Sequence, residues 1–233
     1  LIELNLRDGN YVGSVYSETQ TGFISGGTVT EEPENGDIYP GLQAVQEGGS
    51  GNFIIERLQD VYVNGISGDD TNNGTDAENA VQTLERALKL AADDGTIYVC
   101  GTVTVDSGLT VDGAKIERAD GFDGVLISVD GANAVMTLKN TSIDGKDETV
   151  SYGSYLVFIT NGGTLNIESG TEIINNKTTA VYVNNRSYLY MTGGAIRDNE
   201  RINPTADGFY DGGAGIYNCG TTEISGGEIS GNT

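Results

Sequence analysis

Three segments of the chain carry one pattern: ITNGGTLNIESG at 159–170, VNNRSYLYMTGG at 183–194 and IYNCGTTEISGG at 216–227. Aligned without a gap, they have three columns of like residues: Asn161, Asn185 and Asn218; Ile167, Met191 and Ile224; and Gly170, Gly194 and Gly227. The repeat steps are 24 residues (185 minus 161) and 33 residues (218 minus 185). A fixed register at such periods is typical of solenoid proteins.

Within each repeat, apolar and polar residues alternate for a few positions before a Gly or Asn interrupts them. This alternation predicts short strands that turn at corners, rather than helices. Further strands are predicted ahead of the repeats, at 61–63, 96–99, 102–105, 109–111, 125–129, 135–138 and 155–159. We therefore predict an all-β fold, a parallel β-helix of about five coils with two or three strands in each coil.

An amphipathic helix is predicted at 80–92, just before the strands. Val81, Leu84, Leu88 and Ala91 share one of its faces, and either Asp76 or Thr83 caps its start. The first coil of a solenoid exposes an apolar end and open strand edges, so we expect this helix to cover both.

The predicted boundary between two parts of the chain lies near residue 58. Residues 1–58 lack the repeat and form a strand and loop segment or the end of a preceding module, whereas 59–233 form the β-helix. The chain starts at Leu1 without Met and stops at Thr233 within a repeat, so we expect a piece of a longer protein, truncated at its C-terminus.

Composition limits the classes of partner. The net charge is −22, from 34 acidic and 12 basic residues, and this charge repels nucleic acids and anionic membranes. No run of about 18 apolar residues occurs, so no membrane insertion is expected. The chain has no His, and its two cysteines, Cys100 and Cys219, form no metal-ligand cluster or disulfide framework. We expect no cofactor, with calcium as the one alternative.

Two parts of the sequence resemble known families. The segment VYVNG at 61–65, followed by DDTNNGT at 69–75 and AVQTLERAL at 80–88, resembles the opening of right-handed parallel β-helix proteins of the pectate-lyase-like superfamily. The segments GGAGIYN at 212–218 and ISGGEISGN at 224–232 resemble the repeats of adhesin-like surface proteins from gut Firmicutes. The resemblance implies a right-handed β-helix and a Gram-positive bacterial surface, but no one activity, since this fold hosts lyases, hydrolases, tailspikes and adhesins.

Two polar clusters have structural and functional interpretations. Asn161, Asn185 and Asn218 predict a structural ladder of stacked amides at a turn, with ligand binding as the alternative. A calcium site is one interpretation of the loop that holds Asp69, Asp70, Asn72 and Asp76, and an Asx-rich turn leading into the helix is the other.

The candidate binding loop is the insertion between Ile196 and Ile216, where the repeat step lengthens. It combines charged and aromatic side chains: Arg197, Asp198, Asn199, Glu200, Arg201, Asp207, Phe209, Tyr210 and Asp211. Solenoid insertions project as loops that often bind ligands, and aromatic rings beside carboxylates suit a sugar. The residues predicted to bind are Arg197, Asp207, Phe209, Tyr210 and Asp211.

An enzyme is the alternative function. A glycosidase needs a pair of carboxylates, which Asp198, Asp207 and Asp211 could supply, and a polysaccharide lyase needs a base such as Arg201. The absence of Trp and His weakens both possibilities. We therefore favour a non-catalytic, extracellular or cell-surface module, a stalk or a binder of glycan or protein ligands.

Overall fold

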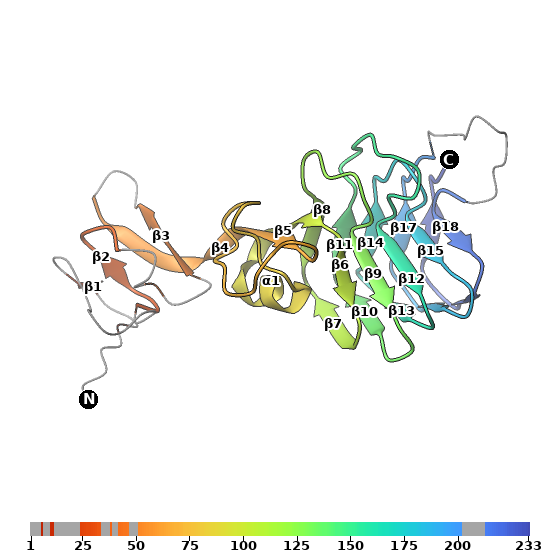
Figure 1. The fold of residues 1–233 in the computed structure, drawn as a ribbon, viewed down its shortest axis with the longest axis horizontal. Coiled ribbons are helices and arrows are strands. Elements are labelled where there is room, and N and C mark those ends of the chain that lie inside the picture. The colour runs from red at the N-terminus through yellow and green to blue at the C-terminus, as the bar shows by residue number, and fades with distance from the viewer. Residues whose placement is uncertain are drawn as a thin grey trace.

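The computed structural model of the protein describes residues 6, 10–11, 24–33, 38, 42–46, 51–201 and 213–233. Within them the molecule is elongated and rich in strands, with a single helix, α1 (Figure 1). From β5 onward, successive strands pass from one sheet to the next, and every third strand pairs in parallel with its predecessor in the same sheet. The chain is therefore all-β with parallel sheets of stacked strands, an arrangement compatible with a solenoid. We use the word coil for each succession of three strands, one from each sheet.

We name the sheets 1, 2 and 3. In the described part of the chain, sheet 1 has the order β1-β2-β4-β5-β8-β11-β14-β17-β20, with β3 beside β4. Its strands are β1 Asn10–Tyr11, β2 Thr28–Val29, β3 Leu42–Gln46, β4 Phe53–Asn64, β5 Ala91–Gly101, β8 Lys115–Arg118, β11 Ser142–Asp144, β14 Glu172–Ile174, β17 Ala195–Arg197 and β20 Glu228–Ser230. Sheet 2 consists of β6 Val103–Val105, β9 Ile127–Asp130, β12 Val157–Thr160, β15 Val181–Val183 and β18 Ile216–Asn218. Sheet 3 consists of β7 Gly108–Asp112, β10 Val135–Lys139, β13 Thr164–Ile167, β16 Tyr188–Met191 and β19 Thr221–Ile224.

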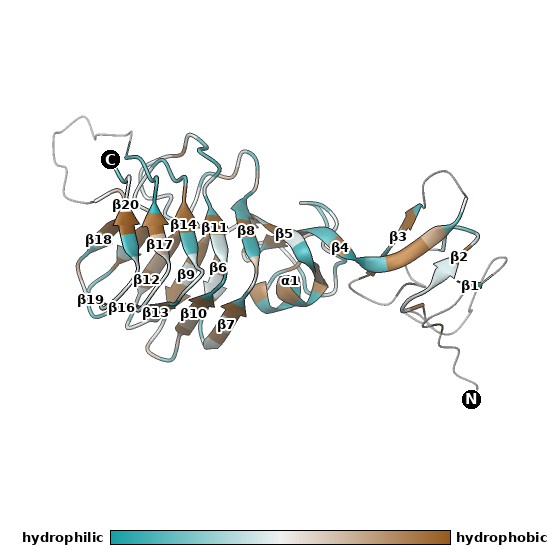
Figure 2. Ribbon diagram, turned by 180° about the vertical axis from the view of Figure 1, so that it is seen from behind, coloured by the Kyte–Doolittle hydropathy of each residue, from teal (hydrophilic) through white to brown (hydrophobic). Residues whose placement is uncertain are grey.

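The core lies between the three sheets and consists of columns of aliphatic side chains. In sheet 2, Val129, Ile159 and Val183 follow one another in register, and all three are fully buried. Sheet 3 repeats the pattern with the fully buried Leu138 and Ile167. We call the stack of strands from β5 to β20 the rod. Figure 2 shows strands of alternating hydropathy along it. Burial of these aliphatic columns between neighbouring coils makes the largest favourable contribution to the free energy of folding of such a stack.

Sheet 1 contains strands that the sequence pattern did not predict. Ile116, Ile143, Ile173 and Ile196 form a fully buried column in β8, β11, β14 and β17. Each of these strands turns one Ile into the core between polar or partly exposed neighbours. Alternation cannot be recognised from a single apolar residue, so β8 and β11 went unpredicted.

Helix α1 spans Leu84–Leu90 and is shorter than the predicted 80–92. The Thr83 hydroxyl accepts a hydrogen bond from the Arg86 N–H at 3.1 Å, which makes Thr83 the N-cap. Val81 pairs instead with Val63 as a parallel bridge, and Ala91 already belongs to β5. Strand pairing on both sides therefore limits the helix. Its buried residues Leu84, Ala87 and Leu90 belong to the same core cluster as the stacked strands.

The N-terminal strands have a hydrophobic cluster of their own. Ile24, Val29, Ile38 and Ile55 form this cluster, which is separate from the core of the rod. The long strand β4 connects the two, because its first half pairs with β2 and β3 and its second half with β5. The predicted boundary at residue 58 thus falls inside β4.

The buried side chain of Arg118 links three loops through hydrogen bonds. It is fully buried. The guanidinium donates hydrogen bonds to the carbonyl oxygens of Phe122, Gly124 and Ser154 at 3.1, 2.7 and 3.2 Å, and to Asn176 Oδ1 at 3.2 Å. Burial lowers the pKa of Arg118 to about 10, so it remains charged at neutral pH. The four acceptors compensate for part of the cost of removing this charge from water.

Candidate functional site

Only part of the predicted binding loop lies within the described residues. Asp207, Phe209, Tyr210 and Asp211 lie outside them, so the sugar site and the carboxylate pair predicted from those residues stay predictions. Arg197, Asp198, Asn199, Glu200 and Arg201 are described, and they continue the regular coil that begins with β17. The N–H of Glu200 donates to the Asn176 carbonyl, and the N–H of Arg201 donates to the Thr233 carbonyl. The first part of the predicted insertion is thus an ordinary part of the rod.

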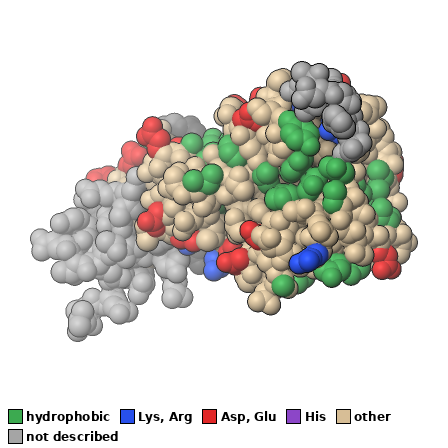
Figure 3. Space-filling model, turned by 45° about the vertical axis from the view of Figure 1, so that its right-hand side comes forward, with side chains coloured by type: hydrophobic (Ala, Val, Ile, Leu, Met, Phe, Trp, Pro, Cys, Tyr) green, Lys and Arg blue, Asp and Glu red, His purple; other side chains and the backbone are tan. Residues whose placement is uncertain are grey.

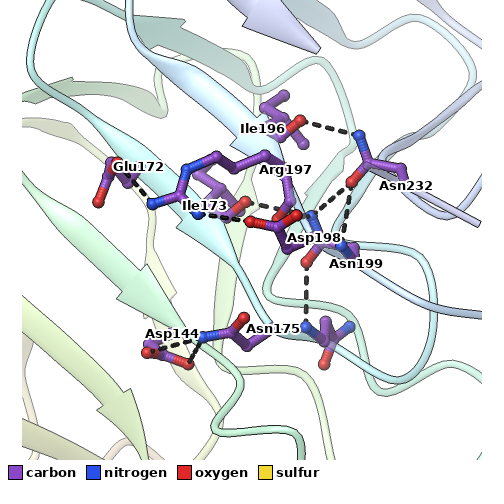
Figure 4. Close-up of polar contacts among 10 residues, drawn as sticks. Asp144, Glu172, Ile173, Asn175, Ile196, Arg197, Asp198, Asn199 and Asn232 are labelled. Carbon is purple, nitrogen blue, oxygen red and sulfur yellow. Dashed lines mark hydrogen bonds and ion pairs between the residues drawn. The ribbon is translucent and has the colours of Figure 1, made fainter. Parts of the chain in front are cut away.

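Arg197 lies on the outer face of sheet 1 between two carboxylates. Its guanidinium contacts Glu172 on the neighbouring strand β14 at 2.8 Å and also pairs with Asp198 (Figure 4). Hydrogen bonds to Glu172 and Asp198 raise the pKa of Arg197. Both partners are accessible to water, so the interaction contributes little to stability. A ligand that binds Arg197 would compete with two intramolecular carboxylates.

Asn199 belongs to a buried asparagine ladder that the sequence prediction placed elsewhere. Asn176 and Asn199 are 1% and 0% exposed. Asn199 Oδ1 accepts from the Asn176 N–H at 3.0 Å. Asn199 Nδ2 donates to Asn232 Oδ1 at 2.9 Å (Figure 4). Asn199 Nδ2 also donates to the Ile173 carbonyl at 3.1 Å. The ladder follows strands β14, β17 and β20 of sheet 1 and links three successive coils. A predicted candidate in the loop is therefore a structural residue.

The predicted ladder of Asn161, Asn185 and Asn218 is wrong. In sheet 2, Ile159 pairs with Val183, but Val183 pairs with Asn218 rather than with Ile216. The gapless alignment therefore fails at β18 by two residues, because the turn from β18 to β19 is two residues shorter than the turn from β15 to β16. The structure shows no amide stack among these three residues, which are all described: Asn161 donates to Asp130, and Asn218 accepts from the Gly220 N–H.

Hydrogen bonds between asparagine and aspartate side chains link neighbouring coils at the turns. Asparagine amides on one coil donate to an aspartate on the preceding coil: Asn140 to Asp112 at 2.8 Å, Asn161 to Asp130 at 2.7 Å, and Asn175 to Asp144 at 3.1 Å. The last pair is drawn in Figure 4. All three asparagines have positive φ, a conformation that Asn tolerates better than most residues.

The carboxylates of the 69–76 loop bind the protein's own backbone. Asp69 accepts from Thr71, and Asp76 accepts from the N–H groups of Glu78 and Asn79. Asn72 donates to the Ala80 carbonyl. Among the described residues, no group of three His, Cys, Asp or Glu side chains could hold a metal ion. The calcium interpretation gains no support from this geometry, whereas the contacts of Asp69 with Thr71 and of Asp76 with Glu78 have the pattern of Asx turns.

Asp70 holds the entry to α1 and predicts an acid dependence. Its carboxylate accepts from the N–H groups of Gln82 and Thr83, each at 2.8 Å, and from the Thr83 hydroxyl at 2.7 Å. Burial raises the pKa of Asp70, but the hydrogen bonds from Thr83 and Gln82 outweigh it, so the pKa is lowered. A carboxyl group with a lowered folded-state pKa stabilises the protein above its unfolded pKa, and this stability is lost as the pH falls through the folded pKa.

We therefore expect the urea midpoint to fall between about pH 5 and pH 3, and to fall less in the Asp70→Asn variant, which cannot be protonated there. The comparison requires urea titrations of both proteins at each pH. Parallel curves for the two proteins would contradict this role of Asp70.

An aromatic surface covers the outer face of sheet 2, and the sequence prediction missed it. We use this name for Tyr155, Phe158, Tyr182 and Tyr217. Phe158, Tyr182 and Tyr217 occupy one register position on β12, β15 and β18. Tyr182 stacks on Tyr155 with ring centroids 5.0 Å apart and meets Tyr217 edge-on at 4.8 Å. Hydrophobic side chains also gather on this side of the rod in Figure 3.

Arg201, at the start of the predicted binding loop, lies near the aromatic surface. The Arg201 guanidinium lies 5.7 Å from the ring centre of Tyr152, which is 53% exposed. Tyr152 also raises the pKa of Tyr155, after the larger effect of burial. Residue 201 is the last described residue before 202–212. Of the predicted site residues, Arg201 therefore lies beside the aromatic surface, while Arg197 lies on sheet 1 and Asp198 directly follows it.

Tyr182 is the central ring of the aromatic surface. It contacts Tyr155, Phe158 and Tyr217, and its hydroxyl donates to Cys219 Sγ at 3.7 Å. Burial and this hydrogen bond raise the pKa of Tyr182 to about 12. The sequence signal was the Tyr that follows the first apolar residue in both VYV at 181–183 and IYN at 216–218.

The chain matches no protein-family model, no curated protein and no solved structure. Across the described residues, no helix combines the length and the apolar character needed to cross a membrane.

Proposed function

We propose that the chain is a non-catalytic, extracellular module of a bacterial surface or secreted protein that binds glycans through its aromatic surface. In this proposal, residues 59–233 form a right-handed parallel β-helix of about five coils, with α1 as its cap. The return of every third strand to the same sheet supports the β-helix, and the right-handed preference of parallel crossovers supports the handedness.

The observation that carries the proposal is the register of the aromatic surface. Phe158, Tyr182 and Tyr217 repeat at the spacing of the strands, which is about 4.8 Å. The position that precedes them in register is Ser128, so the aromatic run begins at β12 and continues toward the C-terminal coil. Partly exposed rings offer apolar area for the C–H faces of sugars, while tyrosine hydroxyls offer hydrogen bonds.

The carboxylates of the described residues favour binding over catalysis. A glycosidase needs one acid with a raised pKa. Where the pKa of a described carboxyl group departs from its usual value, it is lowered, as for Asp112 and Asp123, through hydrogen bonds to neighbouring side chains. Asp198 is paired with Arg197. The glycosidase alternative therefore depends on Asp207 and Asp211.

The test is a glycan array with and without Ca²⁺, followed by titration of the bound glycan. We expect Tyr182→Ala to weaken binding by about tenfold or more, because aromatic anchors at binding sites commonly contribute over about 1.4 kcal/mol. Binding with Ca²⁺ removed should be unchanged, because the proposed surface contains no carboxylate.

The matched control is Tyr62→Ala, since Tyr62 also stacks on a tyrosine, Tyr98, but on sheet 1. It should bind like the unmodified protein, and both variants should keep their circular dichroism spectra. Equal affinity in Tyr182→Ala, no glycan bound on the array, or turnover of an oligosaccharide would each overturn the proposal.

A further inference from the structure

A shallow groove lies at the turn between β15 and β16, where sheet 2 meets sheet 3. Its volume is about 710 Å³. The residues that line it are Ala132, Asn161, Gly162, Thr164, Asn185, Arg186 and Tyr188. Tyr188 is 39% exposed, and its ring lies parallel to that of Tyr190. The groove thus combines an exposed ring, two carboxamides and a guanidinium, and it lies outside the aromatic surface.

Arg186 has no partner among the residues that the structure describes. Most other described cations do have one: Arg57, Lys115, Lys139, Lys146, Lys177 and Arg197 pair with carboxylates. Arg118 is bound by buried carbonyls, and Arg201 lies over the ring of Tyr152. In a chain with 34 acidic residues, an exposed arginine without a carboxylate partner keeps its donors available for an external anion.

The backbone at Arg186 suggests that the side chain is not required for the turn. Its φ is 65°, a region that non-glycine residues enter at a cost. Since Thr164 pairs with Tyr188, the equivalent position one coil earlier is Gly162, whose φ is 92°. Glycine serves the same turn without strain, so the turn itself gives no reason for an arginine.

We propose that this groove binds an anionic sugar, a pyranose that carries a carboxylate or a sulfate ester. The Arg186 guanidinium would form two parallel hydrogen bonds to the anionic group. The exposed ring of Tyr188 would contact the sugar ring. The carboxamide of Asn185, which has no side-chain hydrogen bond in the described part of the chain, would bind a hydroxyl.

The inference rests on the proposed function only in taking a sugar as the ligand. The site and its residues differ from the aromatic surface, so the two proposals can fail separately. The net charge of −22 opposes the approach of any anion, and this long-range repulsion is screened beyond about 8 Å at physiological salt. Selectivity for an anion therefore comes from Arg186 at contact distance rather than from the overall field.

The experiment uses three probes on the intact chain: methyl glucuronoside for the carboxylate, galactose 6-sulfate for the sulfate ester, and neutral methyl glucoside. Binding is followed by NMR titration at physiological salt. We expect one or both anionic probes to shift the resonances of Arg186 and Tyr188 and to bind about tenfold more tightly than the neutral probe. The two anionic probes show which anion is preferred.

Arg186→Gly is the decisive variant, because glycine suits the backbone at this turn and the fold is kept. It should remove the preference for the anionic probes, whereas Arg186→Lys should keep part of it through charge alone. The matched control is Lys89→Ala, since Lys89 is also an exposed cation without a carboxylate partner in the described residues but lies on α1; it should leave binding unchanged.

Anionic probes that bind no better than methyl glucoside, or equal anion binding in Arg186→Gly, would overturn the inference. Tyr182→Ala tests the other proposal: it should weaken glycans found on the array and leave the anionic probes unaffected. A loss of both in Tyr182→Ala would mean that the groove is not a separate site, and would also overturn the inference.

Discussion

Replacing Arg118 by methionine should lower the free energy of unfolding by about 3 kcal/mol, because each buried acceptor left without a donor costs about 1–3 kcal/mol. Methionine fills much of the same space, so the loss reports hydrogen bonds rather than a cavity. The acceptors most affected are the carbonyls of Phe122 and Gly124 and the Oδ1 of Asn176, since the Ser154 carbonyl also accepts from Asn176 and Thr178.

Urea denaturation of the Arg118→Met variant measures this effect. Arg118→Lys should lie between the two proteins, because an ammonium group cannot present the planar fork that reaches several carbonyls. The control is Arg57→Met, since Arg57 is half-exposed and pairs with Asp93 only at 3.9 Å; a change within about 0.5 kcal/mol is expected there. If Arg118→Met and Arg57→Met unfold at the same urea concentration, the buried hydrogen bonds of Arg118 do not stabilise the fold.

The second large effect is expected at the asparagine ladder. Asn199→Ala should cost about 2–4 kcal/mol, because it leaves the Asn176 N–H without a partner in the buried turn and removes a donor from the Ile173 carbonyl. It also removes the contact to Asn232 on the next coil. The matched control is Asn185→Ala, an exposed member of the ladder that the sequence predicted, for which a change within about 0.5 kcal/mol is expected.

Thermal and urea unfolding of Asn199→Ala and Asn185→Ala show which of the two asparagine columns stabilises the protein. A further variant, Asn199→Asp, keeps the acceptor but places a carboxylate against the Ile173 carbonyl, so it should be as destabilising as the alanine. If Asn199→Ala and Asn185→Ala are both as stable as the unmodified protein, neither column holds the coils in register.

Glycine and aliphatic columns were predictable from the sequence because their causes are local. Gly170, Gly194 and Gly227 all have positive φ, and such a turn favours glycine wherever it occurs. The pairing of Ile167 with Met191 and of Met191 with Ile224 also follows the predicted columns. The Thr83 cap was one of two predicted alternatives, and a cap needs only its own first turn.

Register across turns of unequal length could not be predicted. Sheet 3 keeps the step of 33 between Met191 and Ile224 (224 minus 191), whereas sheet 2 steps by 35 between Val183 and Asn218 (218 minus 183). A gapless alignment assigns one step to both sheets. The asparagine column therefore failed while the aliphatic column beside it was right.

The preferences of single residues and their neighbours are enough to predict most of the strands with two or more inward aliphatic residues and the glycine turns between them. The burial of polar residues and the contacts between rings depend instead on the tertiary structure. Asn199 is buried because Asn176 and Asn232 lie on the coils before and after it, and Tyr182 meets Tyr155 and Tyr217 because strand pairing brings them together. Those neighbours are 23 to 35 residues away in the chain (199 minus 176; 217 minus 182), and their contact depends on turn lengths that no local preference sets.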